Sequence, residues 1–206
     1  MVSLAGPAGR AFKGWTPRAM ELARLFASLP NLITLARLLL APLAVLMIVS
    51  QRFMPAFAIF VVAGLSDAVD GFIAKRFDLR TELGAYLDPL ADKALLVSIY
   101  VALGIWGAMP RWIVILVVSR DIMIVSAVIV SWLFDKPVEM KPLMVSKLNT
   151  AAQVALAATI LASLGFGFKP MPYDAVLMGL VTVFTLVSVS LYLVEWVRHM
   201  STIEAR

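Results

Sequence analysis

Residues 63–96 read AGLSDAVDGFIAKRFDLRTELGAYLDPLADKALL, and this stretch decides how the rest of the chain is interpreted. It holds two apolar segments, and each carries two aspartates: Asp67 and Asp70 in the first, Asp88 and Asp92 in the second. A carboxylate at membrane depth is costly, so it usually has a partner and a function. Spacings of three and four residues place each pair on one face of a helix. The stretch therefore predicts a helical hairpin that carries a cluster of acids.

The composition of the whole chain is that of a membrane protein. Of its 206 residues 62% are hydrophobic, and the mean hydropathy is +0.93, whereas a soluble domain is roughly 45–50% apolar. The apolar residues gather in segments of about 20 residues, the length that crosses a bilayer core. These segments are 32–50, 54–74, 83–108, 112–134, 148–166 and 173–197. We expect an all-α polytopic membrane protein with six transmembrane helices.

The segment before the first span mixes apolar and charged residues. Residues 16–28 read TPRAMELARLFAS, with Pro17 suited to the first position of a helix. This pattern predicts a short amphipathic helix on the membrane surface, and the alternative is a disordered basic tail. The expected organisation is a cytoplasmic segment at 1–30, a six-helix membrane domain at 31–200 and a cytoplasmic tail at 201–206.

Charge and cysteine content restrict the orientation and the partners. Lysine and arginine gather in the N-terminal segment, after the second and fourth spans and at the C-terminus. Because positive residues favour the cytoplasmic side, we expect both termini there, in the inner (cytoplasmic) membrane. The net charge of +5 indicates anionic lipid or phosphate as a partner rather than nucleic acid. The absence of cysteine excludes disulfides and thiolate metal sites.

Hairpin geometry brings the four aspartates to one depth. If the chain turns near residues 79–80, Asp67 lies level with Asp92 and Asp70 lies level with Asp88, on the cytoplasmic side. Four carboxylates alone would repel one another. Two Mg²⁺ or Mn²⁺ ions would remove that repulsion, since hard cations prefer oxygen ligands, and the ions could bridge a diphosphate. The cluster therefore predicts a two-metal site for Asp67, Asp70, Asp88 and Asp92.

Small residues beside the aspartates leave space for a bulky ligand. Gly71 and Ala74 follow the first pair, and Gly84 precedes the second. Close packing between membrane helices also favours small residues, so both interpretations remain open for these three positions.

Together these residues resemble a known signature. The pattern Asp67-x2-Asp70-Gly71-x2-Ala74-Lys75-x8-Gly84-x3-Asp88-x3-Asp92 is similar to that of the CDP-alcohol phosphotransferase (phosphatidyltransferase) family. Lys75 stands where the family usually has arginine, but Arg76 follows it and retains the charge. Later motifs, Ser119-Arg120-Asp121 and Ser146-Lys147-x-Asn149-Thr150, resemble the branch that makes phosphatidylglycerophosphate and cardiolipin. The resemblance runs from about Pro30 to Met200.

The resemblance implies an activity and roles for named residues. It implies metal-dependent transfer of a phosphatidyl group from CDP-diacylglycerol to phosphatidylglycerol, giving cardiolipin and CMP, by a homodimeric enzyme. Asp67, Asp70 and Asp88 would bind the metals, and Asp92 would be the catalytic general base and could also contact a metal. The implied contacts of CDP-diacylglycerol are Asp67, Gly71, Ala74, Lys75, Arg76 and Gly84.

The acceptor alcohol leaves a second reading open. Glycerol 3-phosphate as acceptor would make the protein a phosphatidylglycerophosphate synthase, although that type more often has a second lysine where Asn149 stands. A cation channel or transporter is a remote alternative that explains the acids but not the spacing of the small residues. We expect Arg120 and Lys147 to bind the acceptor phosphate. Arg120 could instead pair with Asp121 or a site aspartate, and Lys147 could reach lipid headgroups.

Two further cations have weaker assignments. Arg37, in the first span, could pair with a carboxylate, line the route of the acceptor or reach toward headgroups, and we leave it outside the catalytic set. Lys93 follows Asp92 and is expected to neutralise local charge.

Overall fold

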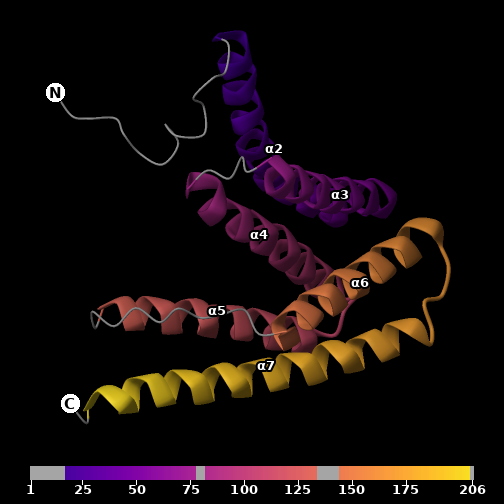
Figure 1. Ribbon diagram of the computed structural model, residues 1–206. Helices are drawn as coiled ribbons and strands as arrows, with labels where there is room; N and C mark the ends of the chain where they lie inside the picture. Colours follow the sequence, from indigo (N-terminus) through magenta and orange to yellow (C-terminus); the bar gives the residue numbers. More distant parts are fainter. Residues whose placement is uncertain (1–16, 78–81, 134–143, 205–206) are drawn as a thin grey trace.

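The computed structural model describes residues 17–77, 82–133 and 144–204, and within them it leaves out the side chains of 17–32, 68, 70–90, 128–133 and 199–204. The described chain forms helices and no strand, so the all-α prediction is confirmed (Figure 1). The helices are α2 (Pro17–Val49), α3 (Phe53–Phe77), α4 (Glu82–Trp106), α5 (Arg111–Leu133), α6 (Met144–Phe166) and α7 (Tyr173–Glu204). The helices coincide closely with the predicted spans, except that α2 begins much earlier.

Two helices in the described part of the chain are long and apolar enough to cross a membrane. They are Met144–Phe166, with mean hydropathy 1.4, and Tyr173–Arg198, with mean hydropathy 2.2. The apolar parts of α2 and α3, Ile33–Val49 and Phe53–Asp67, are shorter. These findings fit a membrane protein, whereas six spans remain a prediction.

Helix α2 joins two elements that the sequence analysis had separated. It runs without a break from Pro17 through Pro30 to Val49, so the expected surface helix and the first span form one helix. Pro17 is its first residue, as predicted. A proline lacks a backbone N–H, but a helix continues through it when neighbouring groups satisfy the carbonyl that is left without a donor. The predicted boundary at residue 30 therefore falls inside a helix.

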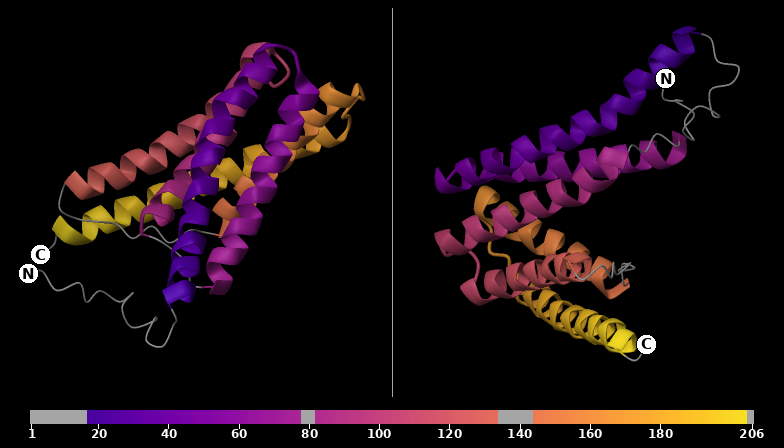
Figure 2. Two further views of the ribbon diagram at one scale, coloured as in Figure 1. Left: turned by 90° about the horizontal axis from the view of Figure 1, so that it is seen from above. Right: turned by 90° about the vertical axis from the view of Figure 1, so that its left-hand side faces the viewer.

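Helices α3 and α4 each connect α2 to later helices of the chain. Helix α2 packs against both α3 and α4, α6 packs against α7 and α3, and α5 contacts α4 and α7. Successive helices run in opposite directions, so α2, α4 and α6 begin at the end of the bundle where α3, α5 and α7 finish (Figure 2). Buried alanines at the α2 and α3 contacts, among them Ala41, Ala44 and Ala63, let the helix backbones approach closely.

Two glycines follow the C-terminal ends of α4 and α6. Gly107 follows α4 with φ of 83°, and Gly167 follows α6 with φ of 73°. This left-handed conformation costs glycine little and satisfies carbonyls at the end of a helix. Between the helix ends, Ile99, Tyr100 and Leu103 of α4 are fully buried, and the Tyr100 hydroxyl donates to the Gln153 carbonyl of α6 at 3.0 Å. Helix α4 is thereby held in the middle of the core, with Asp92 and Lys93 on its N-terminal half.

Candidate active site

Two of the four aspartates meet on one arginine. Nη1 of Arg37, on α2, lies 2.6 Å from Oδ1 of Asp67 on α3, and it also donates to Oδ1 of Asp92 on α4. The Arg37 side chain is 1% exposed, whereas those of Asp67 and Asp92 are 42% and 45% exposed. We call these three residues the carboxylate junction. A buried cation is thus paired with two carboxylates whose other faces remain open to a ligand.

The junction agrees with the depth predicted for Asp67 and Asp92, and it adds a residue that joins them. The remaining predicted donor and metal residues lie on α3 and α4, but their side chains fall outside the description: Asp70, Gly71, Ala74, Lys75, Arg76, Gly84 and Asp88. Among the side chains that the structure does describe, no group of three or more acids or histidines could hold a metal ion. The four-carboxylate metal site therefore remains a prediction.

A cavity of about 380 Å³ opens beside the carboxylate junction. Its polar end is formed by Arg37, Asp67, Asp92 and Lys93. Its remaining walls are mostly apolar and come from α3, α4 and α6: Phe60, Val61, Ala63, Gly64, Leu65, Leu95, Leu96, Thr150, Val154 and Ala158. A site with a charged end and an apolar body is suited to an amphiphilic ligand.

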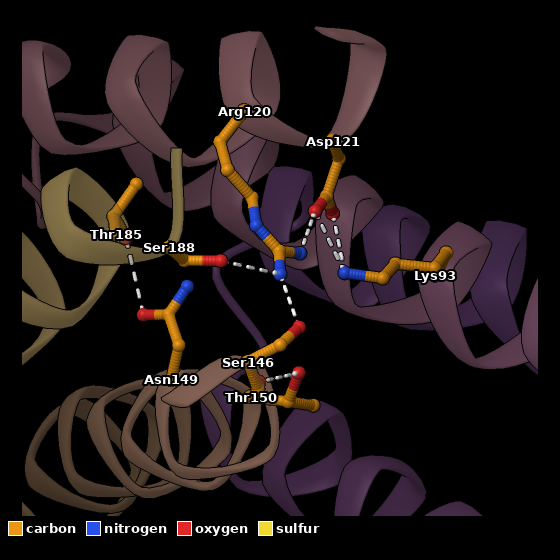
Figure 3. A network of polar contacts seen from close by, with 8 residues as sticks. All are labelled: Lys93, Arg120, Asp121, Ser146, Asn149, Thr150, Thr185 and Ser188. Carbon is orange, nitrogen blue, oxygen red and sulfur yellow. Dashed lines mark hydrogen bonds and ion pairs between the residues drawn. The ribbon is translucent and has the colours of Figure 1, made fainter. Parts of the chain in front are cut away.

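A second polar cluster joins α4, α5, α6 and α7 (Figure 3). Nζ of Lys93 lies 2.7 Å from both carboxylate oxygens of Asp121, and Nη1 of Arg120 donates to Oδ1 of Asp121 at 2.6 Å. Nη2 of Arg120 donates to the Ser146 hydroxyl and, at 3.1 Å, to the Ser188 hydroxyl. We call these residues the Arg120 network: Lys93, Arg120, Asp121, Ser146 and Ser188. Its net charge is positive, because it holds two cations and one carboxylate.

Arg120 is held on several sides within this network. Its side chain is 3% exposed, and its guanidinium carbon lies 6.0 Å from the centre of the Tyr192 ring, within the range of a cation–π contact. The pairing with Asp121, one of the alternatives raised by the sequence, is present. Lys147 is exposed on the first turns of α6, next in sequence to Ser146, so it lies near the network without being one of its buried members.

Residues further along α6 extend the polar interior. The Asn149 side chain is fully buried and accepts a hydrogen bond from the Thr185 hydroxyl at 3.0 Å. Gln153, four residues on and also fully buried, has a side-chain amide with no hydrogen-bond partner among the described residues. Position 149 therefore contributes a neutral amide rather than a third cation; its oxygen is engaged by Thr185, and its buried nitrogen has no hydrogen-bond partner among the described residues.

The carboxylate junction and the Arg120 network are neighbouring parts of one site. Asp92 belongs to the first and Lys93 to the second, and both residues line the same cavity. The cavity therefore has the carboxylates of Asp67 and Asp92 at its polar end, and Lys93 links this end to the net positive Arg120 network. Such an arrangement can hold a phosphate between cations while a carboxylate accepts a proton from a nearby hydroxyl.

Pairing with a carboxylate was one of three roles that the sequence allowed for Arg37, and the structure shows that role with two carboxylates. The sequence did not predict the pairing of Lys93 with Asp121. Arg37 lies within the apolar run ITLARLLLAP, and a charge inside such a run is itself a signal of a functional partner. The pairing of Lys93 with Asp121 carried no comparable signal, since it depends on how α4 and α5 are placed. Lys93 does neutralise local charge, as expected, but its partner is Asp121.

Comparison with known proteins identifies the family of the chain. Residues 27–192 match the family model described as CDP-alcohol phosphatidyltransferase. The human cardiolipin synthase (CMP-forming) is 34% identical over 73% of this chain and 55% of its own length. A rice (Oryza sativa subsp. japonica) chloroplastic CDP-diacylglycerol–glycerol-3-phosphate 3-phosphatidyltransferase is 32% identical, over 85% of this chain and 62% of its length. The Bacillus subtilis protein named for the same reaction is 29% identical, over 78% and 91%.

These relatives are named for two different reactions. The chain spans about half the length of the human relative, and the identities to the two kinds of protein differ by only a few per cent. The comparisons therefore show the family of this chain and leave its acceptor unresolved.

Proposed function

The chain belongs to the CDP-alcohol phosphatidyltransferase family, and on that premise we propose that it transfers a phosphatidyl group from CDP-diacylglycerol to phosphatidylglycerol, giving cardiolipin and CMP. The observation that carries this proposal is the meeting of Asp67 and Asp92 on Arg37 at the polar end of an otherwise apolar cavity. A diphosphate lipid has the same division into a charged head and an apolar body. The family resemblance of the sequence and the geometry of the described residues support the same reaction.

The donor lipid would place its diphosphate at the carboxylate junction and an acyl chain along the apolar wall. Phe60, Val61 and Leu65 of α3 and Val154 of α6 line that wall, and burying a methylene group there contributes about 0.8 kcal/mol. The proposed contacts of the head group are Asp67, Gly71, Ala74, Lys75, Arg76 and Gly84. Of these, the side chain of Asp67 is described and lies at the cavity.

Members of this family generally use divalent metal ions. The donor set fits such ions, because carboxylate oxygens of Asp67 and Asp92 converge on one positively charged nitrogen and hard cations bind carboxylate oxygens. We propose that Asp67, Asp70, Asp88 and Asp92 hold two Mg²⁺ or Mn²⁺ ions. Bound ions would neutralise the charge of the diphosphate and of the departing CMP.

The transfer itself requires a group that accepts a proton and the breaking of the bond that joins CMP to the phosphorus. The hydroxyl oxygen of phosphatidylglycerol forms a bond to the phosphorus that carries the diacylglycerol, and the bond from that phosphorus to the oxygen of CMP breaks. Asp92 takes the proton of the hydroxyl as general base. Arg37 holds the carboxylate of Asp92 in place through a hydrogen bond to Oδ1.

The positive charge of the Arg120 network supports an anionic acceptor. Arg120 and Lys147 are the proposed contacts of the acceptor phosphate, and Arg120 is held close to the cavity through Asp121 and Lys93. Phosphatidylglycerol has one phosphodiester charge, and the neutral Asn149 suits it better than the more highly charged phosphate of glycerol 3-phosphate. Two relatives named for glycerol 3-phosphate transfer make that acceptor the second candidate.

The setting of the enzyme is part of the same proposal. We place a six-helix membrane domain that ends near residue 200 in the cytoplasmic membrane, with both termini and the site on the cytoplasmic side. The exposed apolar residues of the helices, such as Leu39, Ile105 and Ile115, support contact with lipid. A homodimer is the proposed assembly.

The decisive experiment measures CMP release by the purified full-length protein with CDP-diacylglycerol and Mg²⁺ or Mn²⁺. Phosphatidylglycerol, glycerol 3-phosphate and inositol are supplied one at a time, and the lipid product is identified by mass spectrometry. Cardiolipin formation with phosphatidylglycerol is the expected result. Activity with glycerol 3-phosphate alone would refute the proposed acceptor, and cation transport without CMP release from any acceptor would refute the enzyme.

A further inference from the structure

Asp121 connects two cations that belong to different helices. Its carboxylate accepts from Lys93 of α4 through both oxygens at 2.7 Å, and from Arg120, its neighbour on α5, through Oδ1 at 2.6 Å (Figure 3). The Asp121 side chain is 11% exposed. Charge-assisted hydrogen bonds of this length are stronger than neutral ones, so the carboxylate fixes the position of both cations.

The other contacts of the two cations differ. Arg120 also donates to Ser146 on α6 and Ser188 on α7, so its place does not depend on Asp121 alone. Lys93 has a flexible side chain, is 37% exposed and lines the cavity beside Asp92. Asp92 lines the same cavity as Lys93, so without Asp121 its carboxylate is one that the flexible Lys93 side chain could turn to. An ammonium bound to Asp92 would compete with the acceptor hydroxyl for the oxygen that takes its proton.

We propose that Asp121 is a positioning residue that draws Lys93 away from Asp92 and holds it beside Arg120, the proposed contact of the acceptor phosphate. This inference rests on the proposed function, because it assigns Asp92 the role of general base. Asp121 acts through Lys93 and does not itself touch the reacting atoms. A purely structural role, in which the pair only ties α4 to α5, makes different predictions.

Suppression by a second substitution separates the two roles. Asp121→Asn keeps an oxygen for Arg120 but removes the charge that holds Lys93, and we expect kcat to fall on the order of tenfold, with the KM for CDP-diacylglycerol unchanged. Adding Lys93→Met removes the competing ammonium, so the double variant should recover most of that loss in kcat. Asp121→Glu, which retains the charge, should keep more activity than Asp121→Asn. Glu195→Gln, which removes an exposed carboxylate of α7, is the control and should behave as wild type.

A structural tie predicts the reverse for the double variant. If the Lys93–Asp121 pair serves only to join helices, the double variant stays as slow as Asp121→Asn and both lower the melting temperature equally. That result would overturn the positioning role. Equal kcat for Asp121→Asn and wild type would also overturn it.

A measurement without turnover tests the contact itself. The rate at which acetic anhydride modifies Lys93 in the full-length protein is followed by peptide mass spectrometry, with exposed Lys147 as the internal reference. Asp121→Asn should speed modification of Lys93 severalfold while Lys147 is unaffected, and Asp121→Glu should retain protection. An unchanged rate at Lys93 overturns the inference even if the enzyme is active. If wild type releases no CMP while Lys93 is protected, the proposed function has failed, and with it the catalytic purpose of the contact.

Discussion

Asp67 of α3 and Asp92 of α4 are joined by one nitrogen atom, Nη1 of Arg37, which lies on a third helix. The two carboxylates are held by a guanidinium that is almost entirely buried, while each carboxylate remains more than 40% exposed. The cation therefore belongs to the protein interior and the anions belong to the cavity. Replacing Arg37 and replacing one of the aspartates should therefore have different consequences.

Replacing Arg37 should reduce the stability of the protein. Arg37→Met leaves Asp67 and Asp92 facing each other without their shared cation, and we expect a loss on the order of 2 kcal/mol in the free energy of unfolding, because hydrogen bonds to charged groups contribute about 1.5–3 kcal/mol. Thermal unfolding in detergent measures this loss. Arg37→Lys keeps the charge but not the planar guanidinium, so its melting temperature should lie between those of wild type and Arg37→Met. A melting temperature of Arg37→Met equal to that of wild type would contradict the junction.

Replacing Asp92 should separate binding from chemistry. Asp92→Asn keeps the size of the side chain and an acceptor for Arg37 but cannot take a proton, so CMP release should fall about 10²–10⁴-fold while most CDP-diacylglycerol binding is retained. Turnover is measured by CMP release and binding by retention of labelled CDP-diacylglycerol on the immobilised protein. Near-normal turnover in Asp92→Asn would rule out this residue as general base.

Removing divalent ions should abolish turnover reversibly. Treatment with EDTA should stop CMP release, and Mg²⁺ or Mn²⁺ should restore it, because the proposed ions neutralise the charge of the diphosphate and of the departing CMP. Asp67→Asn should raise the metal concentration needed for half-maximal rate, since one ligand oxygen becomes an amide oxygen. Glu195→Gln should leave that concentration unchanged. Full activity of wild type in excess EDTA is the result that speaks against the metal site.

Arg120 should affect the acceptor more than the donor. Arg120→Gln removes the charge that we propose binds the acceptor phosphate, and we expect the KM for phosphatidylglycerol to rise about tenfold, or roughly 1.4 kcal/mol, with little change in the KM for CDP-diacylglycerol. Ser188→Ala removes only a 3.1 Å hydrogen bond to Arg120 and should shift the same KM less. Equal increases for donor and acceptor in Arg120→Gln would indicate that Arg120 serves the fold rather than the acceptor.

Two glycines of neighbouring helices should respond in opposite ways to alanine. A Cβ at Gly165 of α6 would lie 3.2 Å from the backbone N and Cα of Met54 on α3, so Gly165→Ala should separate the helices and cost about 1–3 kcal/mol. Gly179 of α7 has no atom within 4 Å of such a Cβ, and Gly179→Ala should be neutral or stabilising by up to about 1 kcal/mol. Thermal unfolding of the two variants checks this contrast, which fails if Gly165→Ala melts no lower than Gly179→Ala.

Local sequence patterns accounted for most helix positions and for part of the site. Long apolar runs bounded by glycine and proline placed α3 to α7 near their observed bounds, because the length of each run indicates a membrane-spanning helix. The merging of the surface helix with the first span at Pro30 was missed, since whether a helix continues through proline depends on its neighbours. The shared depth of Asp67 and Asp92 followed from the hairpin, because depth along a helix is set by the number of residues from the turn.

The sequence by itself determined the helices, the acidic pairs on them and the family, since each depends on spacing along one chain or one hairpin. Only the tertiary structure decided which cations pair with Asp67, Asp92 and Asp121. Arg37 reaches Asp67 and Asp92 because α2 packs against both α3 and α4, and Lys93 turns to Asp121 because α5 lies within reach of α4. The partner of a buried charge is the nearest opposite charge in space, and that distance arises from helix packing rather than from position along the chain.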